Sequence, residues 1–145
     1  MNKEKKLLGI WKLMEYKLIY NDEKIIYPFG ENPIGNIIYT LCGHMCVQIM
    51  RAQRLKCSTE YYFNITHEEK IEIADNFLCY MGKYKIINDN VVHYPEISSF
   101  TNYINIPQKR EYKFEGNNLV LSCFFLIKGS NDRCHSYLTW RKLDV

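Results

Sequence analysis

The feature that most constrains this chain is a series of short β-type runs separated by tight-turn signals. Asn88-Asp89-Asn90 and Glu115-Gly116-Asn117-Asn118 each separate two runs rich in β-branched and aromatic residues. Such a pattern is typical of β-hairpins, in which a short turn joins two antiparallel strands. The 12 Tyr, 7 Phe and 2 Trp among the 145 residues agree with it, because aromatic side chains pack well on pleated surfaces. We therefore expect an all-β fold.

Eight segments have the length and the residue types of strands. They cover residues 8–20, 36–41, 44–50, 83–87, 91–97, 108–114, 119–127 and 134–142. Most of the connections are short enough for antiparallel pairing. Eight strands close into a barrel just wide enough for a packed core or one small ligand. No linker or internal repeat interrupts the pattern, so the sequence predicts one domain over residues 1–145.

One segment has helical rather than strand-like spacing. Thr66-His67-Glu68-Glu69 is a capping box, in which the side chains of the first and last residues satisfy each other's backbone N–H groups. Apolar residues follow at helical intervals, and Gly82 is a plausible C-terminal cap: Ile71, Ala74, Phe77, Leu78 and Met81. We expect an α-helix over residues 66–82, either packed on the barrel by its apolar face or acting as a movable lid.

Composition and motifs exclude several functional classes. The net charge of +3 is small and the basic residues are scattered, which argues against nucleic acid as a partner. No segment has enough consecutive apolar residues for a membrane-spanning helix, and the chain shows no secretory signal. The six Cys residues form no Cys-x-x-Cys pair, so we expect free thiols and a cytoplasmic location. The sequence does not decide between a monomer and a homodimer.

Neither a metal nor a cofactor is expected. Cys42, His44 and Cys46 share one face of an extended strand, but they would spread over about 13 Å at roughly 3.3 Å per residue. That spread is too wide for one ion. The sequence also has no Gly-rich phosphate loop, no Gly-x-Ser-x-Gly nucleophile motif and no His-Glu-x-x-His helix.

Several motifs resemble one family. Leu8-Gly9-Ile10-Trp11-Lys12-Leu13 resembles the Gly-x-Trp opening of the lipocalin superfamily, and the stretches 30–40 and 43–51 are similar to the bacterial and fungal lipocalin-like domain family of the calycin superfamily. Similar residues also occur further along the chain: Tyr80-Met81-Gly82-Lys83-Tyr84, His93, Arg110 and Leu138-Thr139-Trp140. The hairpin turn Cys42-Gly43 departs from the usual Asp-Gly, and Arg141-Lys142 departs from the acidic-basic pair that usually follows the last Trp.

The resemblance covers nearly the whole chain and implies an eight-stranded antiparallel lipocalin-like barrel. It also implies a small, largely apolar ligand, because the family is associated with small-molecule binding. Some lipocalin-like barrels act in natural-product pathways as cyclases, isomerases or dehydratases, although the family shares no single catalytic motif.

The alternation of residues along each strand predicts which side chains face the barrel interior. The expected inward sets are Trp11, Leu13 and Glu15; Tyr84 and Ile86; Val91 and His93; Arg110, Tyr112 and Phe114; Leu119, Leu121, Cys123 and Phe125. A β-bulge of one residue would reverse any of these assignments. The expected interior is mainly apolar with a few polar groups, which is the usual make-up of a ligand pocket.

Arg110, His93 and Glu15 are the candidate catalytic residues. A buried guanidinium needs a partner, so Arg110 should meet Glu15, Glu96 or an anionic ligand, unless its head reaches water at the barrel mouth. His93 suits proton transfer near neutral pH, although a lone histidine on a strand is more often a hydrogen-bonded structural residue. The candidate ligand contacts are Trp11, which also suits a core plug at the closed end of the barrel, Tyr39, Gln48, Tyr84, Tyr112 and Phe125.

Two functions fit these features. The first is a cofactor-free cyclase, isomerase or dehydratase that folds a polyketide-like substrate into a reactive shape. The alternative is a carrier that binds a small hydrophobic ligand without changing it. Polar residues on the inward faces favour the enzyme, because a pure carrier needs only apolar walls.

Overall fold

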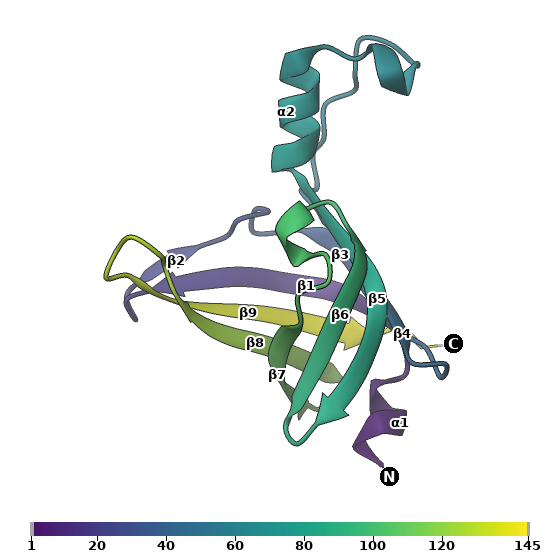
Figure 1. The fold of residues 1–145 in the computed structure, drawn as a ribbon, viewed down its shortest axis with the longest axis vertical. Helices are drawn as coiled ribbons and strands as arrows, with labels where there is room; N and C mark the ends of the chain where they lie inside the picture. The colour runs from purple at the N-terminus through teal and green to yellow at the C-terminus, as the bar shows by residue number, and fades with distance from the viewer. Residues whose placement is uncertain (1, 145) are drawn as a thin grey trace.

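The computed structural model describes residues 2–144, and its sheet forms a closed antiparallel β-barrel (Figure 1). The strands are β1 (Gly9–Tyr20), β2 (Lys24–Ile26), β3 (Ile34–Tyr39), β4 (His44–Met50), β5 (Phe77–Ile87), β6 (Asn90–Ser98), β7 (Gln108–Glu115), β8 (Asn118–Leu126) and β9 (Arg133–Lys142). β1 pairs with β3, each later strand pairs with the next, and β9 returns to pair with β1. The short β2 pairs only with the end of β1. The predicted eight-stranded barrel is confirmed, with β2 as one extra strand.

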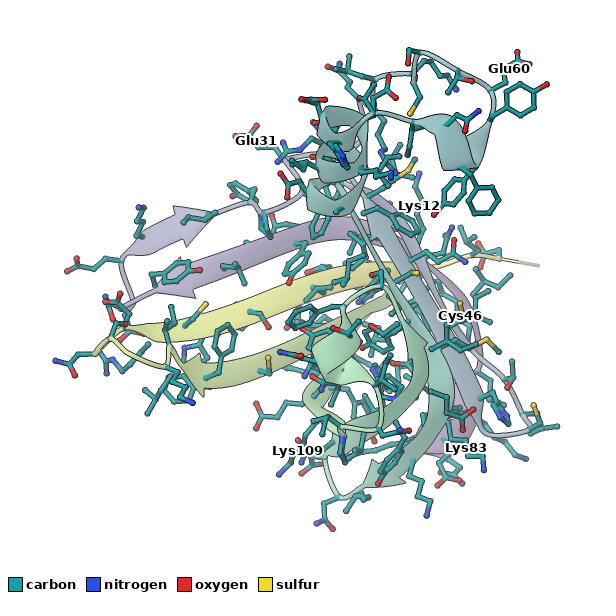
Figure 2. The ribbon with its side chains drawn as sticks, turned by 45° about the horizontal axis from the view of Figure 1, so that its top comes forward. Lys12, Glu31, Cys46, Glu60, Lys83 and Lys109 are labelled. Atoms are coloured by element: carbon teal, nitrogen blue, oxygen red, sulfur yellow. The ribbon has the colours of Figure 1, made fainter. Side chains whose placement is uncertain are left out.

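The barrel separates two kinds of side chain, as strand alternation requires. Polar residues such as Lys83 and Lys109 project from its outer face (Figure 2). The inward residues of the last strand, Trp140 among them, pack on the inward residues of β8 and β1. Within residues 2–144, no helix is long and apolar enough to cross a membrane.

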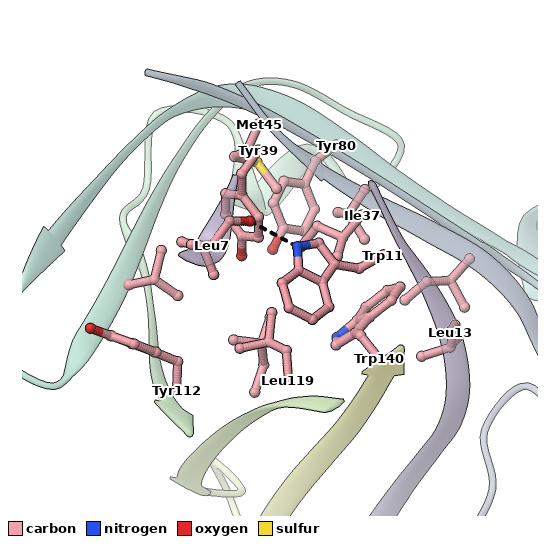
Figure 3. Close-up of a cluster of buried hydrophobic side chains, with 14 residues drawn as sticks. Leu7, Trp11, Leu13, Ile37, Tyr39, Met45, Tyr80, Tyr112, Leu119 and Trp140 are labelled. Atoms are coloured by element: carbon pink, nitrogen blue, oxygen red, sulfur yellow. Dashed lines mark hydrogen bonds between the residues drawn. The ribbon is translucent and has the colours of Figure 1, made fainter. Parts of the chain in front are cut away.

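One end of the barrel is closed by the helix α1 (Lys3–Leu7), which the sequence pattern does not predict. Leu7 is fully buried, and the indole Nε1 of Trp11 donates a hydrogen bond of 2.8 Å to the Leu7 carbonyl. Trp140 and Leu119 pack beside Trp11, so this end is a solid core (Figure 3). The helix forms because Asn2 caps it, and its last residue supplies the apolar contact that holds it in place.

The predicted helix over residues 66–82 is wrong in its extent and its position. α2 spans only His67–Asp75, although its capping box forms as expected, with Glu69 N donating to Thr66 Oγ1 at 3.2 Å. No residue of α2 is buried, and the helix projects from the barrel on an arm between β4 and β5 (Figure 1). Phe77 and the residues after it belong to β5, because pairing with β4 satisfies their backbone and buries Tyr80. Residues 77–82 fit both helical and strand-like spacing of apolar side chains, and their pairing with β4 selects the strand.

Two bulges change which side chains face inward. In β1, Leu13 pairs with Trp140 but Glu15 pairs with Thr139, so Met14 is an extra residue. The bulge turns Tyr16 inward and Glu15 outward. In β5 and β6, the register shifts at Gly82, where a Cβ atom would collide with the backbone carbonyl of Tyr94. Gly82 is therefore a close-approach position within a strand and not the predicted helix cap.

Candidate ligand cavity

A small cavity lies inside the barrel, next to the hydrophobic core around Trp11. Six aliphatic side chains from β3, β4, β5, β8 and β9 form its apolar wall: Ile37, Val47, Ile49, Leu78, Leu121 and Leu138. The remaining lining residues are Tyr16, Tyr80, His93, Tyr103, Arg110, Ser136 and Trp140. The space between them amounts to about 470 Å³ including its open side, but the centre of a water molecule fits in only about 50 Å³. Ligand pockets are usually larger than this, so a ligand requires the lining side chains to move apart.

Tyr103 covers the side of the cavity that faces the β6–β7 connection. It ends the short 3₁₀ helix Thr101–Tyr103 and packs edge-on against Tyr80 and Phe100, at centroid distances of 5.8 Å and 4.9 Å. Tyr16 lines the same cavity and stacks on Phe29 of the β2–β3 connection at 5.7 Å. Because connecting segments are generally more mobile than the strands they join, these two contacts are where the cavity can widen.

His93 is fully buried and held from both sides. Its Nε2 lies 2.7 Å from the hydroxyl of Tyr39, and its Nδ1 lies 2.7 Å from the hydroxyl of Tyr80. Burial, followed by the positive charge of Arg110, lowers the pKa of His93 to about 3. The imidazole is therefore neutral at physiological pH, with one nitrogen donating and the other accepting. Burial likewise raises the pKa of Tyr80 to about 12, so both phenols keep their protons.

Arg110 brings a positive charge to the cavity wall. Its Nη1 donates to the Lys109 carbonyl at 3.0 Å, and its Nη2 donates to Gln108 Oε1 at 3.4 Å. Burial acts to lower the pKa of Arg110, but the surrounding phenols and Cys123 outweigh it, so the pKa is raised and the guanidinium stays charged.

The carboxylate partners expected for Arg110 are not found at the cavity. Among residues 2–144, no carboxylate forms an ion pair with this guanidinium. Glu15 lies on the outer face of β1, where its Oε1 is 3.3 Å from Lys17 Nζ, and Glu96 is exposed on β6. The prediction that Glu15 faces inward is wrong, because the Met14 bulge reverses the alternation of β1. Of the three candidate catalytic residues, only Arg110 and His93 come together.

Most of the candidate ligand contacts lie inside the barrel but away from the cavity. Tyr39 contacts His93 but does not line the cavity, and Trp11 belongs to the core at the closed end of the barrel. The Tyr84 hydroxyl donates to the Thr40 carbonyl at 2.9 Å. Tyr112 is buried beside a groove on the outer surface of the barrel. Its hydroxyl has no hydrogen-bond partner among the described residues. Phe125 faces inward beyond the cavity and is 42% exposed.

Gln48, the remaining candidate ligand contact, points away from the barrel interior. It pairs with Asn36 and Cys79 on the outside of the barrel, and its inward neighbours on β4 are Val47 and Ile49. Three cavity tyrosines were missed by sequence reasoning. Simple alternation along β1 predicts that Tyr16 faces outward, because it does not include the Met14 bulge. Tyr80 falls within the predicted helix over residues 66–82. Tyr103 lies in a connection that no pattern places.

Comparisons with known proteins agree with the barrel. The family model described as lipocalin-like domain matches residues 8–143. The chain belongs to the lipocalin-like domain family. It is also similar to the 4'-hydroxy-3'-methoxypropiophenone carrier protein of Aspergillus oryzae, with 29% identity over 107 residues, which cover 68% of this chain and 96% of the relative. No solved structure gives a significant match.

Proposed function

We propose that this lipocalin-like barrel binds and carries a small aromatic ketone or a similar phenolic molecule in its central cavity. The observation that carries the proposal is a charged Arg110 on a wall of aliphatic and uncharged polar side chains, with no carboxylate partner among the described residues. A ligand oxygen supplies the missing partner, while the aliphatic wall covers the ligand's ring. The relative named as a propiophenone carrier gives independent support for this class of ligand.

The cyclase, isomerase or dehydratase activity expected from the sequence stays a prediction. Two features favour a carrier. Both ring nitrogens of His93 are occupied by tyrosine hydroxyls, which leaves neither free to take a proton directly from a ligand. Glu15 is on the outer face, which removes a candidate catalytic carboxylate from the cavity. We also propose a cytoplasmic location, since all six cysteines are free thiols.

A binding titration tests the proposal. The probe is 4'-hydroxy-3'-methoxypropiophenone, and the signal is the tryptophan fluorescence, because Trp140 lines the cavity and Trp11 packs beside it. We expect saturable quenching in the unmodified protein. Val47→Phe fills the cavity from β4 and should weaken binding at least roughly tenfold, whereas Gln48→Phe places the same ring on the outer face of the same strand and should leave binding unchanged.

Mass spectrometry of the recovered probe separates the two functions. A carrier returns the probe unchanged after prolonged incubation, and any time-dependent product would favour the enzyme. Absence of saturable binding, or equal loss in the Val47 and Gln48 variants, would refute the assignment of the ligand to this cavity.

A further inference from the structure

The cavity holds one positive charge and an excess of hydrogen-bond donors. A guanidinium has five N–H donors, and the two contacts of Arg110 within the described chain leave several of them unused. His93, which also lines the cavity, is neutral at physiological pH. The outward position of Glu15 removes the nearest expected counter-charge. Arg110 is only partly buried, and a neutral ligand that covered its guanidinium would leave the positive charge without a partner.

The hydrogen bonds of His93 determine where the phenol proton of Tyr80 points. A neutral imidazole can accept from one tyrosine and must donate to the other. Tyr39 does not line the cavity and is 1% exposed, so among residues 2–144 its proton finds an acceptor only at His93 Nε2. With Nε2 accepting, Nδ1–H donates to the Tyr80 oxygen. Tyr80 then keeps its own proton free, and Tyr80 lines the cavity.

The opposite tautomer leaves a buried donor unsatisfied. If Tyr80 donated to Nδ1, then Nε2–H would donate to Tyr39, and the Tyr39 proton would lie in the core with no acceptor. Unsatisfied buried donors carry the full cost of desolvation, so the first arrangement is favoured. His93 and Tyr39 are thus positioning residues that turn Tyr80 into a donor toward the cavity.

We propose that the cavity binds its ligand as an oxyanion, which accepts hydrogen bonds from the Arg110 guanidinium and the Tyr80 hydroxyl. This inference rests on the proposed binding function and specifies the charge state of the ligand. The ionised form of a 4'-hydroxyaryl ketone fits the site, because its negative charge is shared between the phenolic oxygen and the conjugated ketone oxygen. Its planar ring suits the aliphatic wall. On binding, the phenolic proton passes to the buffer.

The experiment follows the ionisation of the bound probe by absorbance, since a phenolate absorbs at longer wavelength than its phenol. The unmodified protein at saturating concentration is titrated with pH in the presence of 4'-hydroxy-3'-methoxypropiophenone. We expect the pKa of the bound phenol to fall by roughly one to three units, as for an acid placed beside an arginine. The 3',4'-dimethoxy analogue has no ionisable proton and should bind at least roughly tenfold more weakly at neutral pH.

Three variants locate the effect. Arg110→Met should abolish the pKa shift of the probe, and Tyr80→Phe should reduce it. Arg141→Met, an exposed arginine on β9, should leave it unchanged. Bound probe with an unshifted or raised pKa in the unmodified protein overturns the oxyanion proposal while the binding function stands. A full shift in Arg110→Met also overturns it. Failure of both probes to bind would instead refute the binding function itself.

Discussion

The buried, neutral state of His93 makes the folding stability depend on pH in a calculable way. The folded protein holds the pKa of His93 near 3, whereas a histidine in an unfolded chain titrates near 6.5. Below pH 6.5 the unfolded chain binds a proton that the folded protein does not. The stabilisation is therefore present above pH 6.5 and is lost as the pH falls from 6.5 toward 3.

The size of the effect follows from the same two pKa values. Each pH unit between them removes about 1.4 kcal/mol from the free energy of unfolding. Between pH 7.5 and pH 5.0 the loss amounts to about 2 kcal/mol, because only the part of this interval below pH 6.5 contributes appreciably. Carboxylates also begin to titrate near pH 5, so the contribution of His93 has to be isolated with a variant.

Urea unfolding of the unmodified protein and of His93→Gln at both pH values provides the measurement. The unmodified protein should lose about 2 kcal/mol more than His93→Gln over this interval. His67→Gln removes an exposed histidine of α2 and should behave as the unmodified protein does. Equal losses in all three proteins, or an NMR titration of the His93 ring near pH 6, would refute the reasoning.

Three further predictions concern other parts of the molecule. Gly82→Ala should lower the free energy of unfolding by at least about 2 kcal/mol in urea titrations, because the added Cβ meets the Tyr94 carbonyl at the bulge. Tyr103→Ala should raise the association rate of the probe in stopped-flow fluorescence, because this ring covers the cavity. Thr66→Ala removes the cap of α2 and should weaken the helix by about 1 kcal/mol. Because α2 buries no residue, hydrogen exchange should accelerate within 67–75 while the global unfolding midpoint barely moves.

Strand number and order were predictable because hairpin turns and alternation are local signals. The turn around Asn88-Asp89-Asn90 and the runs beside it specify β5 and β6 without knowledge of their partners. The inward positions of His93 and Arg110 followed from the same alternation, since no bulge separates either residue from its turn. Local pattern was sufficient wherever the strand stayed regular.

The errors occurred where a distant partner determines the geometry. Glu15 and Tyr16 exchange faces because β9 pairs around Met14, and nothing within β1 marks the extra residue. Tyr80 was assigned to a helix because its segment fits helical spacing until β4 is available to pair with it. Bulges and strand extensions are settled by pairing between residues far apart in sequence, which a single sequence does not display.

These two errors concern the residues that give the cavity its chemistry. With Glu15 inside, Arg110 would have a permanent counter-ion and the cavity would be neutral. With Glu15 outside and Tyr80 inside, the same sequence produces a cavity with a net positive charge and a phenol held by His93. Without the bulge at Met14 the cavity would suit neutral ligands, and with the bulge it suits an oxyanion. Tyr16→Glu should place a carboxylate at this inward position, in the cavity that Arg110 lines, and remove the net charge. If that variant folds and still binds the ionised probe as tightly, the charge of the cavity does not select the ligand.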